Sequence, residues 1–343
     1  MESVRSQFQR ELENLELLIS FFDEELNLLK IPQNEHPKLD EFINLFSAFY
    51  SQKRIFNYNS LIISLYGYFE KFIENLLIAY IDNINGYFKR YSSIPHVLTK
   101  NHLKLSLSLL DKVENPRYNG PLNKEGIIEN LHKCININEN YQLNKEAFSQ
   151  HTANFRIQVV DEIFGRIGID SISNKLKGNA EFQAYIKEKY EIEIIGDLDN
   201  DDIHSIMNEL AERRNEVAHG VPSEILSNQI ILDYFNYFKK IAHAITEVVL
   251  LHSNRININE NGQLINELTD CYKGGTILCF NTNFQKLNKG DYIFGVNDSS
   301  IVKAKILNIQ LEDIDIESTD ESQDYEIGVL IDKPFKKNHK VYK

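Results

Sequence analysis

One long apolar stripe constrains the fold more than any other part of the sequence. Between Asn57 and Ile84, apolar side chains recur at the three- and four-residue spacing of an α-helix, and further apolar residues widen the stripe. The stripe consists of Leu61, Leu65, Phe69, Phe72, Leu76 and Tyr80. We therefore expect Asn57–Ile84 to be the strongest core element of a helical domain.

Other helical patterns precede and follow this stripe. They cover Ser3–Leu29, Lys38–Lys53, Phe155–Leu176, Glu181–Glu193 and Glu224–His252. Residues 91–150 are more loosely patterned, with one short helix expected over Asn101–Val113. We interpret this region as an insertion, which could be a lid over a site or a set of solvated loops and small helices.

The pattern changes from helical to β-type in the last part of the chain. The segments TILCFN, DYIFGV, IVKAKILNI, EDIDIE, YEIGVLI and HKVY have strand character and are separated by turn residues. Six short strands predict a small barrel-like domain. The expected fold is mainly α: a helical domain at 1–253 with an insertion at about 91–150, a polar linker at 254–270, and a small all-β, barrel-like domain at 271–343.

Composition limits the functions and the location of the chain. The formal net charge of −13 disfavours a broad electrostatic grip on nucleic acid, so a nucleic-acid site has to be a local positive pocket. Cys134, Cys271 and Cys279 are too few for a disulfide framework and favour a reducing compartment. The charged N-terminal segment lacks the apolar core of a signal peptide, and no apolar run approaches a membrane span. We expect a cytoplasmic protein.

The stretch with the most chemical potential is Asp201–Gly220, which predicts one amphipathic helix. Its apolar positions are Ile203, Ile206, Met207 and Leu210. Asp199 or Asp201 can cap its start, and Gly220 suits its C-terminal end. The last turns carry an unusually polar set: Arg213, Arg214, Asn215, Glu216 and His219.

Three of these side chains fit the cleavage of RNA through its 2′-hydroxyl. His219 can act as a general acid or base, because an imidazole titrates near neutrality. Arg214 offers a fixed positive charge and a planar set of donors for phosphate oxygens. Asn215 can orient either partner by hydrogen bonding. This route needs no metal ion, and no clear cluster of metal ligands accompanies the motif.

The spacing between the arginine and the histidine sets a geometric condition. At about 100° per residue, Arg214 and His219 lie roughly 140° apart around a regular helix, whereas Asn215 and His219 share a face. The two groups meet only if the last turn unwinds or if two copies of the motif face each other across a two-fold axis. We favour the second arrangement, because an isologous contact pairs each motif with its twin.

The local sequence can also be explained without any function. Arginine and histidine near a helix C-terminus are each stabilised by the helix dipole by roughly 0.3–1 kcal/mol. Glu212 and Glu216 could simply pair with neighbouring basic groups. On local sequence alone this plain explanation is the better one, and a wider resemblance is needed to reverse it.

Such a resemblance exists at the end of the motif helix. Arg214 and His219 match the R-x4-H signature of the HEPN superfamily, and Asn215 fits the polar residue that commonly follows the arginine. With Gly220, the RN-x3-H-G form resembles the branch found in prokaryotic toxin and phage-defence loci. The resemblance implies a helical bundle that dimerises and cleaves RNA without metal.

Two further segments extend the resemblance. Ser60–Tyr80 is similar to an earlier core helix of the family, in which a carboxylate, here Glu70, often approaches the site. His151–Asp170 resembles a segment that precedes the motif helix, and its His151 and Asn154 could approach RNA. The insertion and the C-terminal part lie outside the resemblance.

Glu70 needs a partner, because it lies in a strongly apolar helix. It shares a face with Tyr66, four residues earlier, and burying an unpaired carboxylate costs several kcal/mol. A contact with Arg213 or Arg214 at the site would supply the partner. A solvated helix face, or a pair with a nearby lysine such as Lys71, is an equally good explanation.

The leading prediction is a metal-independent endoribonuclease of toxin–antitoxin or anti-phage defence systems. His219 would move the proton, Arg214 would stabilise the phosphate and Asn215 would orient them. The supporting candidates are Arg213, Glu216, Glu70 and Tyr66. We expect no cofactor and no metal. The expected partners are RNA, a second copy of the chain, and an antitoxin or another defence protein, with no membrane contact.

Two alternatives stay open. The chain could be a non-catalytic HEPN-type module that binds a nucleotide, a nucleotidyltransferase or another defence subunit, as relatives in the superfamily are thought to do. It could also be an adaptor whose helices and β domain only join partners. The presence of both Arg214 and His219 argues for the enzyme, because a pure scaffold does not require the two together.

Overall fold

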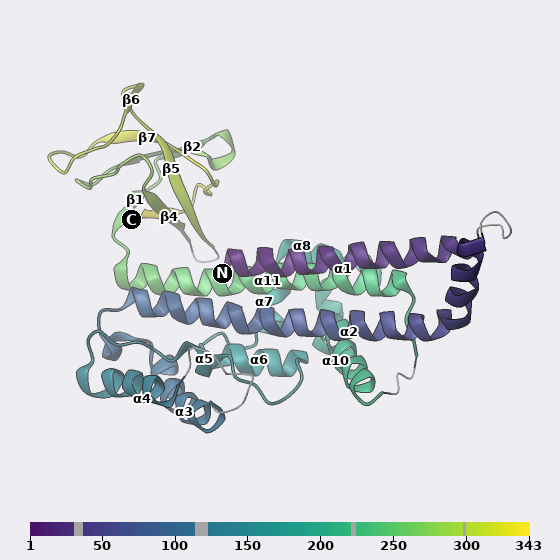
Figure 1. The fold of residues 1–343 in the computed structure, drawn as a ribbon. Helices are drawn as coiled ribbons and strands as arrows, with labels where there is room; N and C mark the ends of the chain where they lie inside the picture. The colour runs from purple at the N-terminus through teal and green to yellow at the C-terminus, as the bar shows by residue number, and fades with distance from the viewer. Residues whose placement is uncertain (31–36, 114–122, 221–223, 298–299) are drawn as a thin grey trace. The chain divides into compact units, whose positions relative to one another are not determined.

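The computed structural model describes residues 1–30, 37–113, 123–220, 224–297 and 300–343. These residues form two compact units, a helical unit at Met1–Val249 and a second unit at Leu250–Lys343 (Figure 1). The expectation of a mainly α chain with a C-terminal β domain is confirmed. Among the helices of the described ranges, none combines the length and the apolarity of a membrane span.

Three long helices build the helical unit: α1 (Glu2–Leu28), α2 (Pro37–Tyr87) and α11 (Asn228–Asn261). All six residues of the predicted apolar stripe are buried in α2. The prediction of two separate helices, Lys38–Lys53 and Asn57–Ile84, is wrong, because α2 is continuous. The residues between them, including Arg54 and Phe56, contain no glycine or proline that would end a helix.

The centre of the helical unit is an aromatic cluster around Phe69 of α2. Its ring lies 4.8 Å from that of Phe238 in α11 and 6.3 Å from that of Phe155, measured between centroids. Phe8 of α1 stacks on Phe72 at 5.0 Å. Edge-to-face and stacked pairs of this kind add to the free energy gained by apolar burial. The cluster joins the three long helices to the segment that precedes α6.

Shorter helices complete the unit. They are α3 (His96–Lys112), α4 (Lys124–His132), α5 (Lys145–Phe148), α6 (Ile157–Gly165), α7 (Ile172–Leu176), α8 (Ala180–Tyr190), α9 (Asn200–Ile203) and α10 (Ser205–Ala218). In the region expected to be an insertion, α3 packs against α4 and α5, and α5 packs against α2. The helical pattern at Phe155–Leu176, for which Gly165 and Gly168 predict a break, forms α6 and α7, and Gly168 lies between them at a positive φ of 85°.

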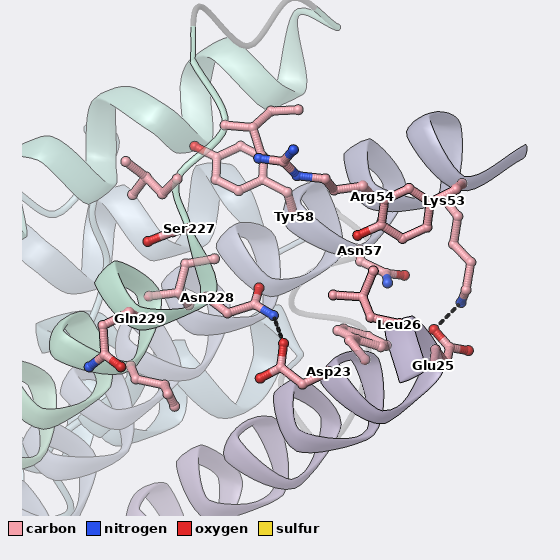
Figure 2. Close-up of a pocket in the computed structure, with 16 residues that line it drawn as sticks. Asp23, Glu25, Leu26, Lys53, Arg54, Asn57, Tyr58, Ser227, Asn228 and Gln229 are labelled. Atoms are coloured by element: carbon pink, nitrogen blue, oxygen red, sulfur yellow. Dashed lines mark hydrogen bonds and ion pairs between the residues drawn. The ribbon is translucent and has the colours of Figure 1, made fainter. Parts of the chain in front are cut away.

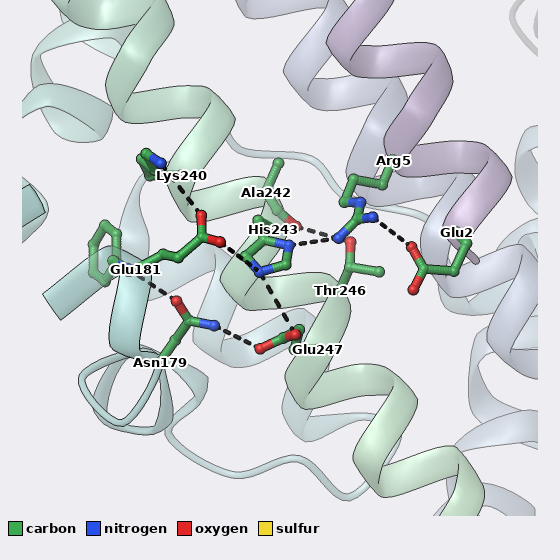
Figure 3. Close-up of polar contacts among 10 residues, drawn as sticks. Glu2, Arg5, Asn179, Glu181, Lys240, Ala242, His243, Thr246 and Glu247 are labelled. Carbon is green, nitrogen blue, oxygen red and sulfur yellow. Dashed lines mark hydrogen bonds and ion pairs between the residues drawn. The ribbon is translucent and has the colours of Figure 1, made fainter. Parts of the chain in front are cut away.

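A polar network ties α1, α8 and α11 together on one side of the unit (Figure 3). Arg5 donates to His243 Nδ1 and pairs with Glu2 at 2.9 Å. His243 Nε2 lies 3.5 Å from Glu247, and Lys240 pairs with Glu181 at 3.2 Å. The network fixes how these helices pack on one another.

The predicted motif helix is interrupted near its start. It forms α9 and α10, separated at His204, whose backbone has φ −106° and ψ 15°. The buried His204 ring hydrogen-bonds Tyr237 at 3.1 Å, and burial lowers the pKa of His204 to about 4. Asp199 caps α9 by accepting from the Asp202 backbone N–H at 2.8 Å, as one of the two expected caps.

The second unit is an antiparallel sheet. Its strands are β1 (Leu264–Glu267), β2 (Asp270–Tyr272), β3 (Ile277–Asn281), β4 (Tyr292–Val296), β5 (Ile301–Leu311), β6 (Ile314–Ile316), β7 (Glu326–Ile331) and β8 (Lys340–Tyr342). Their order is β1-β8-β4-β5-β7-β3-β2, with β6 paired to β5. The sheet is curled, and within the described residues the strand path does not return from β2 to β1.

Residues 254–270, expected to be a polar linker with a possible short helix, contain regular structure. α11 continues to Asn261, where the Asn261 side chain donates to Asn257 at 3.0 Å and Ile258 is buried. Strands β1 and β2 occupy most of the rest. The Asn-rich composition suggested a linker. Relative to alanine, however, asparagine lowers the stability of a helix by only a few tenths of a kcal/mol per residue, about as much as other polar residues do.

Candidate functional site

Helix α10 carries the motif and packs against α2 in the helical unit. Ile206, Met207 and Leu210 are buried, as the apolar pattern predicts. The helix is regular through Ala218, with His219 as its C-cap and Gly220 at a positive φ of 78°. The polar residues at its end therefore project in several directions, and each meets a different environment.

Arg214 and Asn215 belong to a four-residue group that we call the motif cluster, completed by Tyr66 and Asn154. The Arg214 guanidinium lies over the Tyr66 ring, 5.3 Å from its centroid. Asn215 Oδ1 accepts from Asn154 Nδ2 at 2.6 Å and, at the longer distance of 3.5 Å, from Arg214 Nη1. The cluster thus joins α10, α2 and the segment before α6.

Tyr66 also fixes the backbone of that segment. Its hydroxyl accepts from the Phe155 N–H at 3.0 Å and lies 3.4 Å from Asn154 Oδ1. Arg214 keeps most of its donors available, because among the described residues only one long hydrogen bond engages them. The cluster holds one arginine in a defined place while leaving it able to bind an anion.

His151 holds the segment before α6 against α2 by hydrogen bonds. Its Nδ1 donates to the Ala153 carbonyl at 3.0 Å, and its Nε2 donates to Glu70 and Glu74 at 3.0 and 3.1 Å. Its side chain is only 6% exposed. Burial alone would lower the pKa of His151, but these hydrogen bonds outweigh it and raise the pKa to about 9. At neutral pH the ring is therefore an imidazolium.

Glu70 therefore has a different role from the predicted one. It was expected to contact Arg213 or Arg214, to pair with a lysine, or to be solvated. The structure instead pairs it with His151. That partner lies 81 positions away in the chain, too far for any local spacing rule to identify.

Arg213 points to another side of α10 and is part of the packing. It pairs with Glu209 at 2.6 Å and donates to the Tyr58 hydroxyl at 3.1 Å and the Glu224 carbonyl at 3.3 Å. Burial opposes its charge, but the hydrogen bonds outweigh this effect and raise the pKa of Arg213. We call Arg213, Glu209 and Tyr58 the Arg213 strut.

Glu216 lies on the strut side of the helix. Burial raises the pKa of Tyr58, Arg213 opposes this rise, and the negative charge of Glu216 adds to it. A charge that acts on Tyr58 is close to the strut. Arg213 and Glu216, two of the supporting candidates, are thus placed with the packing of α10, whereas Tyr66 lies in the motif cluster.

His219 stands apart from both groups. Its side chain is exposed, and within the described residues no hydrogen bond or ion pair of its ring is found. Because the helix stays regular to Ala218, the first of the two arrangements, an unwound last turn, does not occur in this chain. The structure brings Arg214 and Asn215 together but not Arg214 and His219.

A surface pocket near the strut is not lined by the motif cluster (Figure 2). It lies between α1, α2 and the start of α11, and Tyr58 forms one wall. Asn228 donates to Asp23 at 2.7 Å, and Lys53 pairs with Glu25 at 3.0 Å. Lys53 and Glu25 thus compensate each other, whereas Asp23 is held by a neutral amide.

Glu70, Glu74 and His151 are the described residues whose spacing could hold a metal ion, with ligand atoms all within 4.8 Å of one another. His151 Nδ1 is turned to a carbonyl, as in many metal-ligating histidines. In this structure the second ring proton bridges the carboxylates instead, and an ion would have to displace it.

The sequence analysis overlooked Glu74. Tyr66, Glu70 and Glu74 recur every four residues and so lie along one face of α2. This spacing was visible in the sequence. The bond between Asn154 and Asn215 was not, because the two residues are 61 positions apart.

The fold and the site together define a helical HEPN-type protein: a bundle with an arginine–asparagine pair at the end of a helix that packs on the central one. The family model described as RiboL-PSP-HEPN matches residues 23–251, and the chain belongs to this family. The resemblance to the HEPN superfamily is thereby confirmed. The β unit lies outside the match except at its start. No curated protein matches the chain.

Proposed function

We propose that this HEPN protein is a metal-independent endoribonuclease that acts as a homodimer in the cytoplasm, in a toxin–antitoxin or anti-phage system. The observation that carries the proposal is the motif cluster. In it Arg214 is held over the Tyr66 ring beside Asn215, and most of its N–H donors can still bind a phosphate. The exposed His219 at the end of the same helix supplies the proton-transfer group.

The chemistry follows from these groups. The 2′-oxygen attacks the adjacent phosphorus and loses its proton to a base, a new 2′-O–P bond forms, and the P–O5′ bond breaks as the 5′-oxygen gains a proton. His219 serves as base or acid, and Arg214 stabilises the negative charge on the phosphate oxygens. The products are a 2′,3′-cyclic phosphate and a free 5′-hydroxyl.

A second copy of the chain would supply the missing contact. Because Arg214 and His219 face different directions in one chain, the site is complete only if the His219 of one copy meets the Arg214 of the other. Exposed apolar side chains on the first two helices support association, since exposed apolar surface commonly marks interaction sites. They include Leu17, Phe21, Phe42, Leu45, Phe49 and Phe56.

The first experiment tests the chemistry. Wild type, His219→Ala and His132→Ala are incubated with RNA in EDTA, and the termini are analysed. His132 is a matched control, because it is another exposed histidine in the last turn of a helix. We expect wild type and His132→Ala to produce 2′,3′-cyclic phosphate ends and His219→Ala to produce none. Equal cleavage by His219→Ala would refute the proposal.

The second experiment tests the shared site. Arg214→Ala and His219→Ala are each inactive alone, but a mixed dimer contains one intact site. Random reassortment makes half of the dimers mixed, so the mixture recovers about a quarter of wild-type activity. A mixture no more active than its components would place both residues in one chain and remove the dimeric site.

A non-catalytic binding module is the second candidate. It is favoured by the distance of His219 from the motif cluster, because Arg214, Asn215 and Asn154 alone could hold the phosphate of a nucleotide or contact a nucleotidyltransferase. In that case, wild type and His219→Ala would bind equally, and neither would cleave RNA.

A further inference from the structure

The β unit has one face on which aromatic rings and lysines alternate. In β4, Tyr292 and Phe294 point to one side, while Ile293 lies in the core. The strand register places Lys305 opposite Tyr292, and Lys303 opposite Phe294. On the other side of β4, Tyr342 of β8 is opposite Phe294. Directly opposed residues share a face. We call these five residues the β4–β5 face.

The two lysines of this face are uncompensated. Both are exposed, and within the described residues neither Lys303 nor Lys305 forms an ion pair. Asp332 accepts from the backbone N–H of Lys305 at 2.7 Å. By contrast, Lys337, Lys340 and Lys343 are paired with Asp270, Glu267 and Asp291.

Charge is segregated within the unit. The segment from 312 to 326 is strongly acidic, with the carboxylates Glu312, Asp313, Asp315, Glu317, Asp320, Glu321, Asp324 and Glu326. The β4–β5 face contains lysines and no carboxylate of its own. A chain with a net charge of −13 thus keeps one positive, ring-bearing surface.

The Tyr292 ring is available to a ligand. Its side chain is 52% exposed, and the Lys303 ammonium lies over the ring, 4.5 Å from its centroid. The lysine stem is flexible. A planar group could take the ring face, and the ammonium could turn to a phosphate attached to that group.

We propose that the β4–β5 face binds single-stranded RNA, with a base stacked on Tyr292 and backbone phosphates held by Lys303 and Lys305. Of the three rings, Tyr292 is exposed, Tyr342 is half-buried and Phe294 is buried. An exposed ring next to cations without ion pairs suits single-stranded nucleic acid, because each nucleotide carries a flat base and one negative charge. The choice of RNA rests on the proposed function, but this site binds and does not cleave. It would bring RNA to the protein independently of Arg214.

The test uses the full-length chain with His219→Ala, so that RNA remains intact, and a labelled single-stranded RNA of about 12 nucleotides. Binding is followed by fluorescence anisotropy. Tyr292→Ala is expected to weaken binding about tenfold, and Tyr292→Phe to preserve it because the ring remains. Tyr272→Ala is the matched control: Tyr272 is 54% exposed in the same unit, but its hydroxyl donates to Asp270. It is expected to bind like the parent.

The lysines are tested by salt dependence. Each lost phosphate contact lowers the slope of log affinity against log salt by about 0.7, so Lys303→Gln with Lys305→Gln lowers it by about 1.4. The ion-paired Lys337→Gln with Lys340→Gln is the control and leaves the slope unchanged.

Three results would overturn the proposal: binding unaffected by Tyr292→Ala, an unchanged slope in the double lysine variant, or equal affinity for duplex RNA. Different results would refute the nuclease proposal. If no form of the protein cuts RNA but binding depends on Tyr292, this site stands and the nuclease does not. If RNA is cut while all variants of the face bind like the parent, the reverse holds.

Discussion

Two neighbouring arginines on α10 lie in different environments. Arg213, whose side chain is 12% exposed, is engaged by Glu209, Tyr58 and a backbone carbonyl. Arg214 lies over the Tyr66 ring and, within the part of the chain that the structure describes, forms one long hydrogen bond. Successive residues point about 100° apart on a helix, so one faces the packing and the other faces the motif cluster. Residue type alone therefore does not distinguish the two arginines, whereas their surroundings do.

The largest expected effect separates the two arginines by activity. In the proposed mechanism Arg214 stabilises the transition state, so we expect Arg214→Ala to lower kcat/KM for RNA cleavage by about 10²–10³-fold with little change in stability. Arg213→Ala should retain most of its activity per folded molecule. The measurement is single-turnover cleavage at a temperature at which both variants are folded. Equal losses would show that the contrast between the two residues is not functional.

The second prediction concerns the imidazolium that supports the motif cluster. The folded-state pKa of His151 is about 9, above the value of about 6.5 for an unfolded histidine. Its contribution to stability is therefore full below about pH 6.5 and is lost as the pH rises through 9. We expect His151→Gln to be less stable than wild type by about 2–3 kcal/mol at pH 6, and the difference to shrink strongly by pH 9.5.

Urea unfolding followed by far-ultraviolet circular dichroism checks this, since most helices lie in the same unit as His151. His132→Gln, at an exposed position, is the control. A stability gap for His151→Gln that is independent of pH would mean that the ring is not held as a cation.

The spacing of apolar residues in the sequence predicted the core of each unit. It did not predict the contacts of the candidate site. The apolar stripe of α2 and six of the strands follow local periodicities of 3.6 and 2 residues, and both patterns predicted them. The strands that were missed, β1 and β2, are short and polar, and β1 is defined by pairing with β8 at the other end of the unit. Such a strand has little signal of its own.

The same limit applies to the candidate site. Arg214, Asn215 and His219 were singled out because they are adjacent in sequence on one helix end. Their partners are not adjacent, since Tyr66 and Asn154 come from other elements. The sequence therefore predicted which residues carry the motif but not which of them is held in place, which is set by tertiary packing.

The third prediction tests the Arg213 strut itself. Arg213→Ala deletes hydrogen bonds to Glu209 and leaves the hydroxyl of the buried Tyr58 without its donor. Hydrogen bonds to charged groups contribute about 1.5–3 kcal/mol, so we expect a loss of about 2 kcal/mol in the free energy of unfolding. Arg214→Ala, examined by the same urea titration, should lose less than half of that. A larger loss for Arg214→Ala would exchange the roles assigned to the two arginines.

The smallest expected effect is at Asn154, which links the clamped segment to Asn215. Asn154→Ala removes the 2.6 Å hydrogen bond to Asn215 Oδ1. If that bond orients Asn215 for catalysis, kcat/KM falls about fivefold while stability changes little. Asn130→Ala is the matched control, because Asn130 donates to Asn144 at 2.9 Å away from α10. Should Asn154→Ala cleave RNA at the wild-type rate, Asn215 would not need its partner, and the motif cluster would reduce to Arg214 on Tyr66.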